Sequence, residues 1–351
     1  MIKETQNILK GYAILFIVLH NFCHLEQFGL PQENEMSFSL EKWDLFINGS
    51  YNSLMIIPSF FSFIGWCGVP VFVFLSGYGL SKKYNDKPID IGKYIKHSYL
   101  KLLVMILPAA ILYFSYNLIN GNIWWVSRNI FALSFLNNLI AGIGGSFASS
   151  IAPPYWYLGM TFQLYLFFVI ARKMNDIQLL WGAAFLMVPF FLIPSIDDNT
   201  MILGWLRRNS FGWMPLFLYG CYCGRKNVVC NFSVITNVGL LIVSTLFVVW
   251  SNSNYYLWCI LPIGAIVMFW SLEELTSKNR LTAKSMDFIG RKSMYLFIAH
   301  PISISLINTP PYLHDQTVIN FYYQLTLYLL SLVVISFVYQ YIHNKISSKL
   351  L

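Results

Sequence analysis

The sequence predicts an all-α integral membrane protein, a bundle of about ten transmembrane helices with both termini in the cytoplasm. Hydrophobic residues make up 57% of the 351 residues and charged residues only 11%, whereas a soluble domain carries about 25% charged residues. Apolar runs of about 20 residues, the length that crosses a bilayer core, recur along the chain. Lysine and arginine gather in alternate loops, as in multi-pass membrane proteins.

Ten apolar segments are the expected spans. They run over residues 8–28, 55–81, 99–119, 155–172, 177–196, 211–224, 233–250, 255–272, 287–307 and 320–342. The second contains Pro58 and Pro70, so we expect its first part to be kinked or interfacial. The sixth is short, and we expect its flank with Trp205 and Trp213 at the membrane interface.

The basic residues predict the orientation. If the N-terminus lies inside, the cytoplasmic loops hold 19 of the 23 lysines and arginines. The other four are Lys42, Arg128, Arg207 and Arg208. This asymmetry follows the positive-inside rule. The net charge of +8 is therefore assigned to topology and to attraction by anionic lipid, and no nucleic-acid partner is expected.

One polytopic domain is expected over residues 1–351, with no appended soluble domain. Two long outer stretches are candidates for covering an outward-facing site, because irregular backbone is tolerated near a membrane where protein covers it. Residues 29–54 carry Glu33, Glu35 and two further acidic residues, and residues 120–154 include the Gly/Ser-rich piece AGIGGSFASS.

The cysteines are expected to be small buried hydrophobic residues. They lie within or beside apolar runs, and no Cys/His pair with metal-ligand spacing stands near them. No metal site is therefore predicted. The six cysteines are Cys23, Cys67, Cys221, Cys223, Cys230 and Cys259.

Two histidines are expected deep in the membrane. His20 lies ten residues beyond Lys10, which is about 15 Å along a helix. His300 lies nine residues beyond Arg291 and reaches a similar depth. Buried ionisable groups mark functional sites, although a neutral histidine can also hold helices together through a hydrogen bond. A neutral imidazole suits a general base that takes a proton from an alcohol.

Other polar and aromatic residues are candidates for the same region. His24 lies one turn beyond His20 on the same helix face and either guides a substrate or is interfacial. Ser76 lies six residues before the cytoplasmic Lys82, and Gln163 lies near the middle of its span. The neighbouring Trp156 and Tyr157 are expected either at the site or in an aromatic belt.

Four segments in this order resemble the membrane acyltransferase type 3 family over essentially the whole chain. They are KGYAILFIVLH at 10–20, FVFLSGYGLS at 72–81, YWYLGMTFQLYL at 155–166 and IGRKSMYLFIAHP at 289–301. The resemblance implies transfer of an acyl group, usually acetyl, from cytoplasmic acyl-CoA to a hydroxyl of a sugar or another acceptor.

The same resemblance implies roles for individual residues. His20 corresponds to the histidine regarded as catalytic. Lys10 and one or more of Lys93, Lys96 and Lys101 correspond to basic residues linked to acyl-CoA, and we group Arg291 and Ser76 with them. Many relatives have arginine at the position of Lys10, and lysine lacks its two-pronged phosphate contact. Many also have paired glutamates where this chain has Thr161 and Phe162.

The sequence therefore predicts an O-acyltransferase in the inner membrane of a bacterium. His20 is the expected base or transient acyl carrier, assisted by His300. The expected partners are membrane lipid, acetyl-CoA or another acyl-CoA as co-substrate, and a cell-envelope polysaccharide or its lipid-linked precursor as acceptor. No permanently bound cofactor is expected, and the oligomeric state stays open.

Two alternatives are a membrane acyl-relay component serving a separate extracytoplasmic transferase, and a proton-coupled transporter or flippase. A transporter is often marked by internal repeats and by paired intramembrane carboxylates, and the sequence shows neither.

Overall fold

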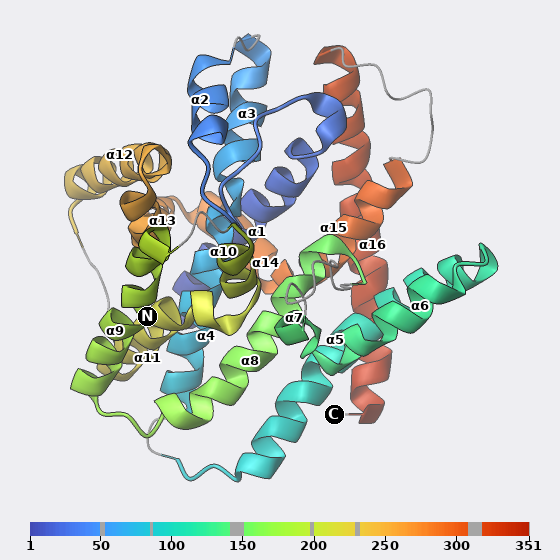
Figure 1. Cartoon of the computed structure of the whole chain (residues 1–351), viewed down its shortest axis with the longest axis horizontal. Coiled ribbons are helices and arrows are strands. Elements are labelled where there is room, and N and C mark those ends of the chain that lie inside the picture. The colour runs from blue at the N-terminus through green and yellow to red at the C-terminus, as the bar shows by residue number, and fades with distance from the viewer. Residues whose placement is uncertain are drawn as a thin grey trace.

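A computed structural model describes residues 1–49, 53–84, 87–140, 151–196, 200–228, 232–307 and 318–350. Every regular element in these ranges is a helix (Figure 1). The α-helices are α1 (Lys3–Cys23), α2 (Leu40–Asn48), α3 (Ile56–Ile64), α4 (Gly68–Tyr84), α5 (Ile91–Ile119), α6 (Ile123–Asn129), α7 (Asn137–Ile140), α8 (Trp156–Ala171), α9 (Asp176–Ile196), α10 (Thr200–Arg208), α11 (Met214–Lys226), α12 (Val234–Trp250), α13 (Tyr255–Thr276), α14 (Arg280–Arg291), α15 (Ser293–Ile307) and α16 (Val318–Leu350).

Six helical stretches of the described residues are long and apolar enough to cross a membrane. They are Ser53–Tyr84, Ile91–Ile119, Asp176–Ile193, Val234–Ser253, Tyr255–Thr276 and Val318–Lys349. The other four expected spans coincide with α1, α8, α11 and α15, which are shorter or more charged. The all-helical membrane class is thus confirmed, whereas the count of ten spans and the side of the termini stay predictions.

Two expected spans differ from the helices. The first was expected to reach residue 28, but α1 ends at Cys23, and Gly29 takes a left-handed φ of 61° after a short 3₁₀ turn. The chain reverses there because glycine adopts this conformation without a steric cost. The ninth, 287–307, is two helices, since the backbone at Lys292 (φ −97°, ψ 0°) separates α14 from α15.

Glycines bring α1 into backbone contact with its neighbours. A Cβ atom on Gly290 would lie 1.7 Å from the Asn7 carbonyl oxygen, and one on Gly11 would lie 2.4 Å from that of Met286. Any side chain at either position would force α1 and α14 apart. The Asn7 side chain also donates to Asp287 (2.8 Å). The glycines of KGYA and IGRK are therefore packing residues that fix the start of α1.

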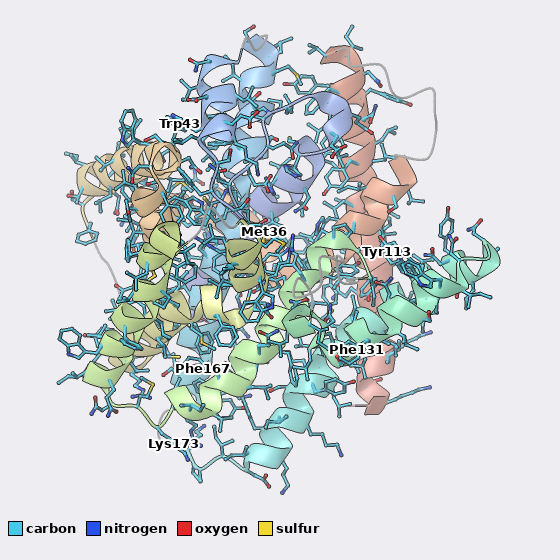
Figure 2. All side chains as sticks on the ribbon, in the orientation of Figure 1. Met36, Trp43, Tyr113, Phe131, Phe167 and Lys173 are labelled. Carbon is cyan, nitrogen blue, oxygen red and sulfur yellow. The ribbon has the colours of Figure 1, made fainter. Side chains whose placement is uncertain are left out.

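The two ends of the bundle differ in composition. Helix α2 lies at the top of Figure 1, and the α8–α9 connection lies at the bottom. Figure 2 shows Trp43 of α2 near the top and Lys173 of the α8–α9 connection at the bottom. Helix α2, which carries Glu41 and Asp44, and the basic α8–α9 connection thus lie toward opposite ends of the molecule, whereas the loop before α2 reaches the middle, where Figure 2 shows Met36.

The expectation for the cysteines is confirmed within the described residues. Cys23, Cys67, Cys221, Cys223 and Cys259 are buried and unpaired. Cys230 and the Gly/Ser-rich piece at 141–150 lie outside the described residues.

Candidate functional site

His20 is buried in the last turn of α1, where only 4% of its surface is exposed. The 3₁₀ segment Gly65–Cys67 packs directly against it. A Cβ atom on Gly65 would lie 2.6 Å from the His20 Cβ atom and 2.8 Å from the Phe16 carbonyl oxygen. Glycine at position 65 therefore creates the space that the histidine occupies.

The hydrogen bond of His20 defines its tautomer. Its Nδ1 atom lies 3.2 Å from the carbonyl oxygen of Phe61 at the end of α3. A carbonyl oxygen only accepts, so Nδ1 carries the hydrogen and donates it. In the neutral ring Nε2 then holds a lone pair. This is the form of histidine that takes a proton from an alcohol or attacks a carbonyl carbon.

His24 and the carboxylate of Glu33 lie beside His20. The rings of His20 and His24 lie 5.2 Å apart, centroid to centroid, and His24 Nδ1 lies 2.6 Å from Glu33 Oε2. Burial opposes the ionisation of Glu33, but the close contact with His24 and the positive electrostatic influence of Lys42 and the histidine side chains outweigh it. The pKa of Glu33 is lowered to about 2, so the carboxylate is charged at neutral pH.

The loop that carries Glu33 is fixed to the bundle at several points. The Ser62 hydroxyl donates to the Pro31 carbonyl (2.7 Å), and Lys42 Nζ donates to the Glu33 carbonyl (2.6 Å). The indole of Trp258 on α13 donates to the Asn34 carbonyl (2.7 Å). These contacts hold Glu33 over the end of α1.

Sequence reasoning did not select Glu33 as a site residue. It grouped Glu33 with the other acidic residues of the outer loop, because nothing in its local pattern distinguishes it. The signal available in the sequence was Gly29, because glycine favours turns and follows His24 closely enough for the chain to turn back toward α1.

A metal ion is one alternative occupant of this cluster. His20, His24 and Glu33 each offer a ligand atom, and these atoms lie within 4.8 Å of one another. Metal bonds of about 2.0–2.1 Å in a tetrahedral site hold ligand atoms well over 3 Å apart. The 2.6 Å separation of His24 Nδ1 and Glu33 Oε2 is too short for two ligands of one metal ion, so the geometry favours a direct contact between the imidazole and the carboxylate.

His300 lies on α15, which packs against α1. It is fully buried, and its Nδ1 atom donates to the Phe297 carbonyl at 2.6 Å. Its Nε2 atom has no hydrogen-bond partner among the described residues. His20 and His300 are within electrostatic range of each other. The two histidines expected at one depth are thus on adjacent helices with the same tautomer.

Tyr157 and Ser76 lie on the His300 side of this region. The Phe297 ring lies 5.4 Å from the rings of both Tyr157 and His300. The Tyr157 hydroxyl lies near the side chains of Ser76 and Thr161. The Ser76 hydroxyl donates to the Phe72 carbonyl of its own helix (2.8 Å). The Trp156 ring packs at 6.1 Å on Tyr157.

Gln163 has a structural role. Its Nε2 donates to Asn209 (2.9 Å), and its Oε1 accepts from the Ser210 backbone (3.0 Å). Both polar atoms of the amide are engaged. Gln163, a candidate for the site region, therefore holds the turn between α10 and α11.

The basic residues assigned to acyl-CoA separate into two groups. Lys10 and Lys101 lie within electrostatic range of each other. Lys93 is exposed and pairs with Asp90 (3.5 Å), and Lys96 is also exposed. Arg291 pairs with Asp287 (2.7 Å). The structure therefore places Lys10 of α1 within electrostatic range of Lys101 of α5 and engages Lys93 and Arg291 with acidic neighbours on or beside their own helices.

These observations define a helical membrane protein with a buried histidine cluster at the end of α1 and two lysines, Lys10 and Lys101, nearer its beginning. A family model described as an acyltransferase domain matches residues 7–341, essentially the whole chain, so the chain belongs to the acyltransferase 3 family. The resemblance drawn from the four segments is thereby confirmed. No curated protein and no solved structure matches the chain. Family and fold together identify a multi-pass membrane acyltransferase.

Proposed function

We propose that this acyltransferase moves an acetyl group from cytoplasmic acetyl-CoA to a hydroxyl of a cell-envelope polysaccharide or its lipid-linked precursor. The proposal includes a ten-span arrangement in the bacterial inner membrane with both termini cytoplasmic. The observation that carries it is the free Nε2 lone pair of buried His20, which the Nδ1–Phe61 hydrogen bond produces.

The reaction transfers the acyl carbon from the thioester sulfur of the donor to a hydroxyl oxygen of the acceptor. The hydroxyl oxygen of the acceptor attacks the thioester carbonyl while its proton passes to His20 Nε2. The C–S bond then breaks, and the coenzyme A thiolate takes the proton from the imidazolium. In the variant route His20 Nε2 attacks the carbonyl first and the C–S bond breaks, which releases the coenzyme A thiolate. The acceptor hydroxyl then displaces the acyl group from the ring, and its proton passes to the thiolate. Both routes end with the ester, free coenzyme A and neutral His20.

Glu33 and His24 support the charge that forms on His20 during transfer. Glu33 is negative, buried and within electrostatic range of His20. An anion in a low-dielectric site stabilises a nearby imidazolium more strongly than it would in water. Because Glu33 is held by His24 and by the loop, little reorganisation accompanies the reaction.

The two substrates approach from opposite ends in this proposal. Coenzyme A carries phosphates and does not cross the bilayer, so it docks at the Lys10 and Lys101 end. Its arm reaches along α1 toward His20, about 15 Å away by helical rise. The acceptor enters from the side of the 29–54 loop.

Labelled acetyl-CoA and purified candidate glycans, added to the purified protein, test the proposal. His20→Ala is expected to lower glycan labelling by about 10²–10⁴-fold. His97→Ala is the matched control, because His97 is exposed on α5, and it is expected to retain activity. Undiminished labelling by the His20 variant contradicts the proposal. Thioester hydrolysis by the wild type without glycan labelling supports the acyl-relay alternative instead.

A further inference from the structure

A cavity of about 400 Å³ lies between α9, α11 and α13, and its lining includes none of His20, His24 and Glu33. Its walls are apolar and include Met187, Phe190 and Leu216. Leu180 and Ile263 also line it, and they are 39% and 55% exposed on the outside of the bundle. In a membrane, exposed apolar residues on spanning helices face lipid. The cavity therefore opens toward the hydrocarbon.

Arg207 is the one charged residue among those that line the cavity, and only 2% of its surface is exposed. Its guanidinium lies over the ring of Trp258 at 4.3 Å and near that of Trp213 at 5.1 Å. Its Nε and Nη1 atoms have no hydrogen-bond partner among the described residues. The aromatic rings favour the positive charge but cannot replace hydrogen-bond acceptors.

No carboxylate among the described residues forms an ion pair with Arg207. Burial lowers the pKa of Arg207 to about 10, so it stays protonated at neutral pH. Glu35 lies within electrostatic range, but burial, and then the charge of Glu33, raises the pKa of Glu35 to about 8. Glu35 is therefore mainly uncharged at pH 7. A buried cation whose Nε and Nη1 atoms lack an acceptor in the described part of the chain is costly, and an anionic ligand removes that cost.

The position of Arg207 is fixed before any ligand binds. The Trp213 indole donates to the Arg207 carbonyl (2.6 Å), and the Gln163–Asn209 hydrogen bond holds the following turn. Gly212 permits the turn, since a Cβ atom there would lie 2.6 Å from the Leu206 carbonyl oxygen. A guanidinium held in place loses little entropy when it binds an anion.

We propose that this cavity is a binding site for a lipid phosphate. The apolar chain lies between α9, α11 and α13, and the phosphate oxygens accept hydrogen bonds from Nε and Nη1 of Arg207. A phosphate matches the planar fork of a guanidinium. The site is separate from acyl transfer, because none of the residues that form it belongs to the histidine cluster.

Native mass spectrometry of the full chain in detergent tests this site. Four probes are added in turn: a polyprenyl phosphate, phosphatidylglycerol, the uncharged polyprenol and phosphatidylcholine. The wild type is expected to retain one of the first two, and the one retained identifies the source of the phosphate. Arg207→Gln is expected to weaken that binding by about tenfold or more, the size of a lost charged hydrogen bond. Arg208→Gln, the neighbouring arginine outside the cavity lining, is the matched control.

A second variant tests the site with Arg207 unchanged, so the result does not depend on the folding of Arg207→Gln. Ala184 lines the cavity at an exposed position of α9, so Ala184→Trp blocks the entrance without touching Arg207. It is expected to lose the same lipid. The proposal is overturned if the wild type binds neither phosphate, if the polyprenol binds as well as its phosphate, or if folded Arg207→Gln and Ala184→Trp both keep wild-type binding. Acetylation is not measured, so a failure here is independent of the proposed function.

Discussion

The Nδ1 atom of His24 lies 2.6 Å from the Oε2 atom of Glu33, one helical turn beyond the buried His20. This contact joins the end of α1 to a loop that returns over it. It places a negative charge next to a histidine in a part of the protein where charges are expensive.

Glu33→Gln is expected to lower kcat for acetyl transfer by about 10–100-fold, because glutamine keeps the shape but removes the charge that stabilises an imidazolium. KM for acetyl-CoA is expected to change little, since the donor docks at the other end. Steady-state kinetics measure both quantities. Glu41→Gln is the control, because Glu41 is exposed in the same acidic segment. Equal kcat values for the wild type and Glu33→Gln would falsify a role for this charge.

Gly65→Ala is expected to displace His20, because the new Cβ atom would lie 2.6 Å from the His20 Cβ atom. Overpacking of this kind costs about 1–3 kcal/mol. A lower Tm, measured by thermal unfolding in detergent, and a lower transfer rate are both expected. Gly79→Ala is the matched control, since no atom lies within 4 Å of a Cβ atom at that position of α4. If both variants behave alike, the contact with His20 is unimportant.

Lys10→Ala and Lys101→Ala are each expected to raise KM for acetyl-CoA by about tenfold, with a smaller effect on kcat, because each removes a charged contact to phosphate. The difference from the wild type is expected to shrink at high salt. Lys93→Ala is the comparison, since Lys93 is exposed and already paired with Asp90. A KM for Lys93→Ala as high as that for Lys101→Ala contradicts the grouping of Lys10 with Lys101.

Glu35→Gln is expected to stabilise the protein at pH 8 and to have little effect at pH 5. The pKa of Glu35 is about 8 in the folded protein because of burial and the charge of Glu33, and about 4.3 in an unfolded chain. The folded state binds the proton more tightly, so stability falls as pH rises from about 4.3 to about 8.

Glutamine removes this pH dependence, and the expected gain at pH 8 is about 1–3 kcal/mol. Tm values at pH 5 and pH 8 measure it. The result that contradicts the prediction is a Tm difference between variant and wild type that is the same at both pH values.

Much of the architecture could be predicted from hydropathy because crossing a bilayer is a local requirement of each segment. All ten expected spans coincide with helices, including the short α11. The end of α1 and the break at Lys292 were not predicted, because both depend on backbone conformations at single residues. The count of spans also depends on how short helices pack together, which composition does not describe.

Some residues of the candidate site could be predicted from the sequence, and others could not. His20 and His300 could be selected because an ionisable residue within an apolar run is conspicuous, and Lys10 because it begins that run. Glu33 and Arg207 could not, since acidic and basic residues in loops are ordinary. Their significance comes from burial, and burial of a loop residue is decided by contacts with segments far away in the chain.

The sequence by itself therefore determined the membrane class, the helical segments, the family and the histidine at the centre of the proposed reaction. Each of these is carried by residues close together in the chain. Only the tertiary structure decided that Glu33 meets His24, that Gly65 makes room for His20, and that Arg207 lines an apolar cavity with its Nε and Nη1 atoms unpartnered among the described residues. Each of these relationships joins residues from separate segments, and the packing of the helices and the closure of their loops bring them within a few ångströms of each other.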